Sequence, residues 1–156
     1  MTSFQRISLF LLRLGLGWLF FYAGLTKLLN PSWSAAGYLG NAKTFPWLYE
    51  WLASPTVLPV TNFLNEWGLT LIGAALILGI AVRFSSILGA VMMFLYYLPT
   101  LDFPYPNAHA LIVDEHIVYL FAFLVLAGFR AGHVWGLGAW CAKCPWVSKL
   151  PAWLRE

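Results

Sequence analysis

Two basic side chains interrupt an otherwise apolar segment over residues 12–31, LRLGLGWLFFYAGLTKLLNP. If this segment is helical, at about 100° per residue, one face carries a group that could bind or pack: Arg13, Gly17, Gly24 and Lys27. The two charges then lie about 21 Å apart, at about 1.5 Å per residue. The glycines would let a second helix or a flat ligand approach closely. The same pattern also fits charges that reach lipid headgroups and glycines that only pack helices.

Further ionisable side chains occur in two later apolar runs. Glu66 shares a helix face with Thr70 and Gly73 in one run, and His116 begins another beside Asp114 and Glu115. If the helices alternate in direction, Lys27, Glu66 and His116 reach the same depth. Ionisable groups at membrane depth are costly, about 2.5–3.5 kcal/mol each on insertion scales, and often mark function.

These groups could satisfy one another or move protons. We therefore predict Glu66, His116 and Lys27 as catalytic residues. The binding slot would be lined by Arg13, Gly17, Gly24, Thr70 and Gly73. A structural alternative remains open, in which Lys27 and Glu66 form an ion pair that locks two helices and His116 caps a loop-to-helix junction.

Cys141 and Cys144 form a CxxC pair near the end of the chain. This spacing suits a redox dithiol, or simply two small residues in an aromatic-rich tail. Because the sequence contains no second cysteine pair, we expect no metal site here. His109 and His116 are expected on the outer side and His133 on the inner side, with no bis-histidine pair at matching depths, so we expect no haem.

The composition requires lipid to cover most of the chain, because 61% of the residues are apolar and only 10% are charged. Four apolar runs have lengths suited to a hydrocarbon core, at about residues 7–29, 63–82, 84–101 and 111–129. We predict an all-α integral membrane protein, a single transmembrane domain over residues 1–156 built as a four-helix bundle.

The segment between the first two runs, residues 30–62, contains four prolines and cannot form one helix. Its Trp47, Tyr49 and Trp51 suit the headgroup zone, so we predict an interfacial cap in which the FPWLYEWLASP stretch makes at most two helical turns. Residues 131–156 are predicted as a cytoplasmic tail.

The Lys and Arg residues collect on the side that holds both termini, which predicts a multi-pass protein of the cytoplasmic membrane with both termini in the cytoplasm. The net charge of +3 is spread along the chain without a basic cluster, so nucleic-acid binding is not expected. The expected partners are the lipid bilayer and other subunits of a membrane complex.

The stretches RLGLGWLFFYAGLTKLLNP, NEWGLTLIGAALILGIAVRFSSILGAVMMF and GFRAGHVWGLGAW together resemble the DoxX/DoxD family of small four-helix membrane proteins. The resemblance implies a membrane redox setting, since DoxD-type members are the small subunit of a thiosulfate:quinone oxidoreductase. This chain would then be a membrane subunit of a quinone-linked oxidoreductase related to thiosulfate or thiols. The alternative is a non-catalytic anchor or assembly subunit of a larger complex.

Overall fold

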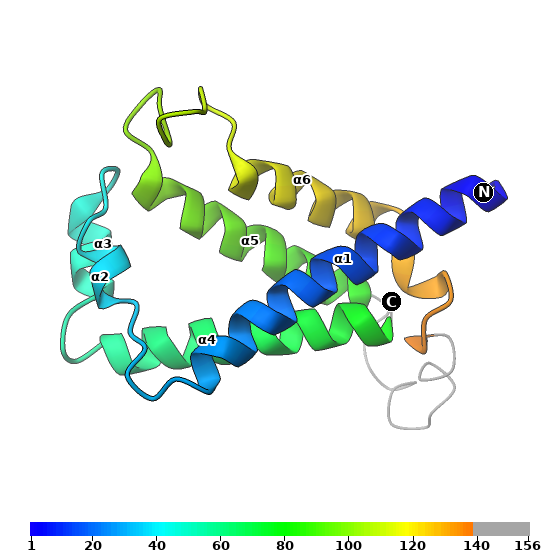
Figure 1. Ribbon diagram of the computed structural model, residues 1–156, viewed down its shortest axis with the longest axis horizontal. Helices are drawn as coiled ribbons and strands as arrows, with labels where there is room; N and C mark the ends of the chain where they lie inside the picture. The colour runs from blue at the N-terminus through cyan, green and yellow to red at the C-terminus, as the bar shows by residue number, and fades with distance from the viewer. Residues whose placement is uncertain (139–156) are drawn as a thin grey trace.

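A computed structural model describes residues 1–138, and these residues fold into helices joined by loops, with only isolated β-bridges beside them (Figure 1). The elements in chain order are α1 (Ser3–Leu28), α2 (Ala36–Leu39), α3 (Pro46–Leu52), α4 (Leu58–Leu78), α5 (Val82–Thr100), α6 (Glu115–Gly128) and the 3-10 turn η1 (Ala131–His133).

The helix ends differ from the predicted ends where a local cap decides them. The first helix begins at Ser3, before the apolar run, because Thr2 and Gln5 form a capping box. The last begins at Glu115, because the Asp114 side chain accepts hydrogen bonds from the His116 and Ile117 amides. The prediction of a short helix in the FPWLYEWLASP stretch is confirmed, since α3 spans seven residues.

Two helices of the described region, α1 and α5, are long and apolar enough to cross a membrane. The shorter α6 is also apolar but spans only 14 residues. All-helical structure is therefore established for the described residues.

A tight seam joins α1 to α4 over the stretch of α1 between Gly17 and Gly24. A Cβ atom placed on Gly24 would lie 2.5 Å from the Thr70 backbone nitrogen, and one on Gly73 would lie 2.6 Å from the Phe21 Cα atom. Such distances are far inside van der Waals contact, so only glycine fits at these positions. The two backbones pack directly on each other, as in small-residue helix pairs of membrane proteins.

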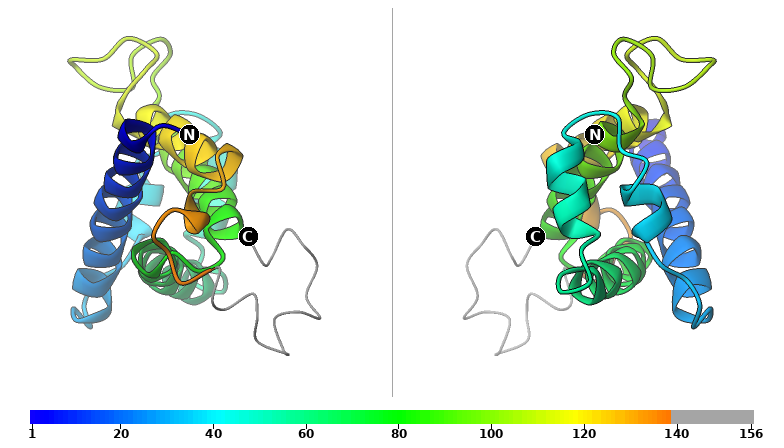
Figure 2. Two further views of the ribbon diagram at one scale, coloured as in Figure 1. Left: turned by 90° about the vertical axis from the view of Figure 1, so that its right-hand side faces the viewer. Right: turned by 90° about the vertical axis from the view of Figure 1, so that its left-hand side faces the viewer.

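The helices α4 and α5 form a wedge instead of a seam. They share one end, where Gly79 (φ +70°) and Ala81 (φ +47°) turn the chain, and they separate toward the other end (Figure 1). The short helices α2 and α3 lie across that wide end (Figure 2), which we call the capped end. On its other side α5 packs against α6.

Hydrogen bonds to the last turns of α5 hold the cap in place. Pro99 lies inside α5 and has no N–H, so it cannot donate to the Leu95 carbonyl. The Tyr49 hydroxyl donates to that carbonyl at 2.9 Å. The Lys43 amide donates to the Pro99 carbonyl at 2.9 Å, and the Thr44 hydroxyl donates to the Leu101 carbonyl at 2.6 Å. The proline that weakens the helix thus creates the acceptor that binds the cap.

Replacing Tyr49 with phenylalanine should loosen the cap, because the Leu95 carbonyl would lose its donor. We expect the free energy of unfolding to fall by about 1–3 kcal/mol. Burial also raises the pKa of Tyr49 to about 12, compared with about 10 in the unfolded chain. The stabilisation is therefore fully present below about pH 10 and lost as the pH rises through about 12. Tyrosinate absorbance and tryptophan fluorescence, followed across this range, should show a smaller alkaline transition in Tyr49→Phe than in the native protein, because Tyr38, whose pKa burial also raises to about 12, still titrates.

Candidate functional site

The predicted ligand slot between the glycines of α1 and the face of Glu66, Thr70 and Gly73 is not present, because helix backbone fills this seam. Gly17 also lies in close contact with α4, since a Cβ atom there would lie 3.0 Å from the Ile77 side chain. The Thr70 hydroxyl is used within α4, where it donates to the Glu66 carbonyl at 2.8 Å. The sequence-based placement of a flat ring here was therefore wrong.

Arg13 is fully buried and binds backbone, so it does not line an open slot. Its guanidinium donates to the carbonyl oxygens of Ala131 at 2.6 Å, Val134 at 2.9 Å and Trp135 at 3.3 Å. We call this arrangement the clasp. Carbonyls that follow the C-terminal end of α6 carry partial negative charge, which stabilises a buried cation without a carboxylate. The segment predicted as the start of a tail is thus fixed against the bundle over residues 131–138.

Lys27 and Glu66 do not form the predicted ion pair among the described residues. The Lys27 ammonium donates to the Ala23 carbonyl at 3.2 Å and lies 5.3 Å from the centre of the Trp33 ring. Glu66 is near enough to act on Lys27 through space, but not within ion-pair distance. A cation–π contact with Trp33 therefore takes the place of the salt bridge.

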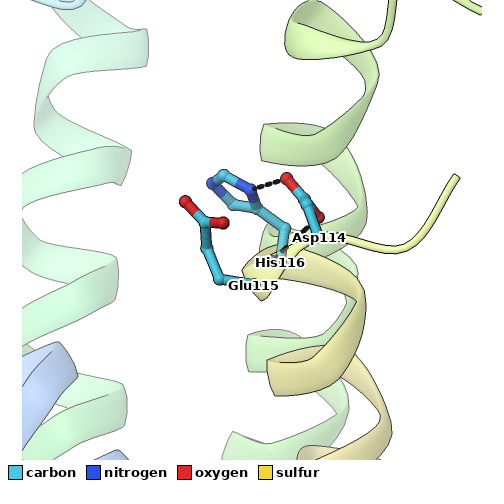
Figure 3. Close-up of side chains that lie close together, drawn as sticks. All are labelled: Asp114, Glu115 and His116. Atoms are coloured by element: carbon cyan, nitrogen blue, oxygen red, sulfur yellow. Dashed lines mark hydrogen bonds and ion pairs between the residues drawn. The ribbon is translucent and has the colours of Figure 1, made fainter. Parts of the chain in front are cut away.

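His116 forms a separate group with two carboxylates at the start of α6 (Figure 3). Its Nδ1 lies 2.7 Å from Asp114 Oδ2, and the Asp114 side chain is only 2% exposed. Glu115 is exposed and completes a group whose nitrogen and oxygen atoms all lie within 4.8 Å of one another. No hydrogen bond or ion pair in the described part of the chain joins this group to Lys27 or Glu66. The three predicted catalytic residues therefore do not form one cluster.

A cavity of about 370 Å³ occupies the wedge between α4 and α5, beneath the cap. This size falls within the range of about 300–1,000 Å³ that is typical of small-molecule sites. Its walls are mainly apolar, and its rim includes Leu64 of α4 and Val91 of α5, both exposed on the outside of the helices. The cavity therefore opens sideways between two apolar helices.

The polar end of the cavity is built by Asn65, Tyr96 and Tyr38, from α4, α5 and α2. The Tyr96 hydroxyl donates to Asn65 Oδ1 at 2.7 Å, and the Tyr38 hydroxyl donates to the Tyr96 carbonyl. The Asn65 Nδ2 group has no hydrogen-bond partner among the described residues. Behind this pair, the Tyr96 ring packs edge-on against His116, with ring centres 6.2 Å apart. The cavity and the His116 group thus meet at Tyr96.

Sequence reasoning did not identify Asn65, Tyr96 or Tyr38. One signal was present, since Asn65 is an amide inside an apolar run next to Glu66. The tyrosines gave none, because aromatic residues are also common at membrane interfaces. The predicted dithiol, Cys141 and Cys144, lies outside the described residues.

A comparison with protein families identifies the family of this chain. The DoxX family model matches residues 8–102, which is more than half of the chain. The chain belongs to the DoxX family. The resemblance inferred from the sequence is confirmed. The DoxX match contains Lys27, Asn65, Glu66 and Tyr96 and ends before Asp114. Neither a curated protein nor a solved structure matches this DoxX chain.

Proposed function

We propose that this DoxX protein is the quinone-binding membrane subunit of an oxidoreductase, and that the quinone binds in the wedge cavity and not in the α1–α4 seam. One observation carries the proposal: a mainly apolar cavity ends at an unpartnered amide donor, Asn65 Nδ2. The side chain bonded to this amide, Tyr96, packs against the histidine of a histidine–aspartate pair. Apolar slots with a few convergent polar groups are typical of small-molecule sites.

The proposal places α1, α4, α5 and α6 across the bilayer. Large apolar side chains are exposed on all four helices, for example Leu11, Leu71, Val91 and Phe121. Such a surface requires lipid or protein to cover it. Arg6, Arg83 and Arg130 all belong to the end opposite the cap, where α1 and α5 begin and α6 ends (Figure 1). By the positive-inside rule this end faces the cytoplasm, with the capped end outside.

The polar ring and the apolar tail of a quinone each match one region of the cavity. A ring carbonyl can accept a hydrogen bond from Asn65 Nδ2, which is the donor that the polar end leaves open. An isoprenoid tail can leave between Leu64 and Val91, through the sideways opening. A ligand with a polar flat head and a long apolar tail therefore matches the chemistry at each end of the cavity.

The electrons would come from a partner subunit or from a small sulfur reductant, as the resemblance to thiosulfate:quinone oxidoreductase subunits implies. Reduction then joins two electrons from the donor and two protons to one quinone and yields a quinol. The alternative is a non-catalytic anchor subunit, for which the close α1–α4 seam and the clasp would supply a rigid scaffold.

Filling the cavity should weaken quinone binding without unfolding the protein. At Gly68, which lines the cavity, an added Cβ atom would meet only the flexible end of Met92, at 2.9 Å. We expect Gly68→Leu to weaken the binding of a short-tailed benzoquinone by about tenfold or more. The affinity can be measured as quenching of tryptophan fluorescence in the purified protein, together with extraction of any co-purified quinone.

Gly15→Leu is the matched control, because Gly15 has no atom within 4 Å of an added Cβ and lies on the exposed face of α1. It should bind quinone like the unchanged protein. Equal quinone affinity in the Gly68→Leu and Gly15→Leu proteins would show that the quinone does not bind in this cavity. A native protein that binds no quinone would favour the anchor function instead.

A further inference from the structure

A second hollow lies at the end of the bundle opposite the cap, between the first turns of α1 and the segment that follows α6 (Figure 1). It has a volume of about 410 Å³, and we call it the basic pocket. Its lining residues are Met1, Arg6, His133, Val134 and Trp135. The clasp fixes one wall of this pocket, because the carbonyl oxygens of Val134 and Trp135 accept hydrogen bonds from Arg13.

Two side chains of the basic pocket can donate hydrogen bonds but have no acceptor in the protein. Arg6 and His133 are both exposed, and neither side chain forms a hydrogen bond or an ion pair with another residue within 1–138. The carboxylates of residues 1–138 all lie in the half of the molecule nearer the cap: Glu50, Glu66, Asp102, Asp114 and Glu115. The pocket therefore offers a guanidinium and an imidazole to an anionic ligand.

A smaller, apolar hollow adjoins the basic pocket. It measures about 220 Å³, and the two hollows share Met1. Its other walls come from Phe4, Gln5, Ser8, Leu9 and Phe129. Phe4 is 78% exposed and Phe129 is 61% exposed, so aromatic surface lies open beside a cationic pocket. A small anion would leave this surface uncovered, whereas a ligand with an acidic head and an apolar chain would cover both hollows.

The position of the two hollows along α1 matches the surface of a bilayer. The 26 residues of α1 extend over about 39 Å, at about 1.5 Å per residue, which exceeds a hydrocarbon core of about 30 Å. Arg6 belongs to the first turns of α1, so in the proposed topology its guanidinium reaches the headgroups of the cytoplasmic leaflet. The exposed Trp135 ring also suits that layer. Basic pockets on this side of a membrane are suited to acidic headgroups.

We propose that the basic pocket binds the phosphodiester of an anionic phospholipid of the phosphatidylglycerol type, and that one acyl chain of this lipid lies in the apolar hollow. The Arg6 guanidinium donates two hydrogen bonds to phosphate oxygens, and an imidazole N–H of His133 donates a third. The inference uses the proposed position of α1 in the bilayer but not the quinone site, which lies near the capped end.

The charge of the pocket selects among headgroups. Phosphatidylcholine carries the same phosphate, but its quaternary ammonium group cancels the charge and needs a carboxylate or an aromatic cage of its own. Beside Arg6 and His133 the described chain places no carboxylate. A glycerol headgroup brings no second cation, so its phosphate charge stays available to both side chains.

The test measures lipid binding to the purified full chain in lipid-free detergent by native mass spectrometry. Phosphatidylglycerol and phosphatidylcholine with the same acyl chains are titrated in parallel. Phosphatidylglycerol should bind to the native protein about tenfold more tightly or better. Arg6→Met should weaken its binding by about tenfold, and His133→Ala by about threefold to tenfold, because each removes a donor to a charged acceptor. Lys43→Met is the matched control, since it removes one exposed positive charge at the capped end.

A second pair of variants separates a lipid from a free anion. Phe129→Ala removes part of the apolar hollow and should weaken the binding of long-chain phosphatidylglycerol by about threefold or more. Phe121→Ala changes an exposed phenylalanine of the same helix outside both hollows and should have no effect. If a large excess of inorganic phosphate displaces the lipid completely, or if Phe129→Ala binds like Phe121→Ala, the pocket holds an anion without the acyl chain and the lipid proposal is wrong.

Two further results would overturn the site itself. Equal affinity for phosphatidylglycerol and phosphatidylcholine would show that charge does not select the headgroup. An equal loss in Lys43→Met and Arg6→Met would show that the net charge of the protein, and not this pocket, governs binding. Both changes affect exposed side chains, so the melting temperature in lipid-free detergent should stay the same. Quinone affinity should also be unchanged in Arg6→Met, so failure of the lipid site and failure of the quinone site are independent results.

Discussion

Replacing Gly73 with alanine should separate α1 from α4 and destabilise the protein by about 3 kcal/mol or more. The added methyl group would lie 2.6 Å from the Phe21 Cα atom and 2.7 Å from the Gly17 carbonyl oxygen. Both are backbone atoms, which cannot rotate away as a side chain can. Overpacking a core typically costs about 1–3 kcal/mol, and a clash with backbone lies at the upper end or beyond it. Thermal denaturation in detergent would measure the loss.

Gly15→Ala provides the matched control on α1, the other helix of the seam. The added methyl group would meet no atom within 4 Å, and alanine favours helix over glycine by about 0.5–1 kcal/mol. This change should therefore be neutral or slightly stabilising. If Gly73→Ala and Gly15→Ala have the same melting temperature, the close backbone contact between α1 and α4 is incorrect. Gly24→Leu should likewise prevent folding, because an added side chain would meet the Thr70 backbone nitrogen.

Replacing Arg13 with methionine should release residues 131–138 from the end of the bundle. Three carbonyl oxygens, those of Ala131, Val134 and Trp135, would lose their charged donor at once. Leaving a buried acceptor without its donor typically costs about 1–3 kcal/mol. We expect a loss of this size in the free energy of unfolding. Protease cleavage after Arg130, followed by mass spectrometry, should become faster because the segment would no longer be held.

Two further variants define what the clasp requires. Arg6→Met removes an exposed charge from the same helix and should change stability by less than about 0.5 kcal/mol. Arg13→Lys keeps the charge but lacks the planar fork that donates in several fixed directions, so it should recover only part of the lost stability. Full stability of Arg13→Met would show that the carbonyls are satisfied without the guanidinium.

The sequence was sufficient for features that depend on neighbours along the chain. Apolar content indicated the membrane class, and apolar runs bounded by prolines gave the four long helices and the short α3 to within several residues. The helix ends were less accurate, since α6 begins at its Asp114 cap and not at the start of the apolar run. These are local properties, because a helix forms and ends through contacts within about four residues.

Tertiary structure alone decided what each helix face contacts. A glycine face accepts a flat ligand or another backbone equally well, and only the position of α4 shows that Gly17 and Gly24 contact backbone. A buried arginine can bind a phosphate, a carboxylate or carbonyls, and the partner of Arg13 lies 118 residues away in the chain.

In the candidate site, too, the sequence indicated the residue types, and only the tertiary structure decided their contacts. Lys27, Glu66 and His116 stand out in the sequence as ionisable groups in or beside apolar runs, but no hydrogen bond or ion pair among the described residues joins them into one cluster. The sequence could not indicate the cavity, because it exists only where α4 and α5 separate and where Pro99 leaves a carbonyl for the cap. Periodicity determines which residues share a face. Which face meets which depends on contacts between distant segments, and a single sequence holds no local signal for those.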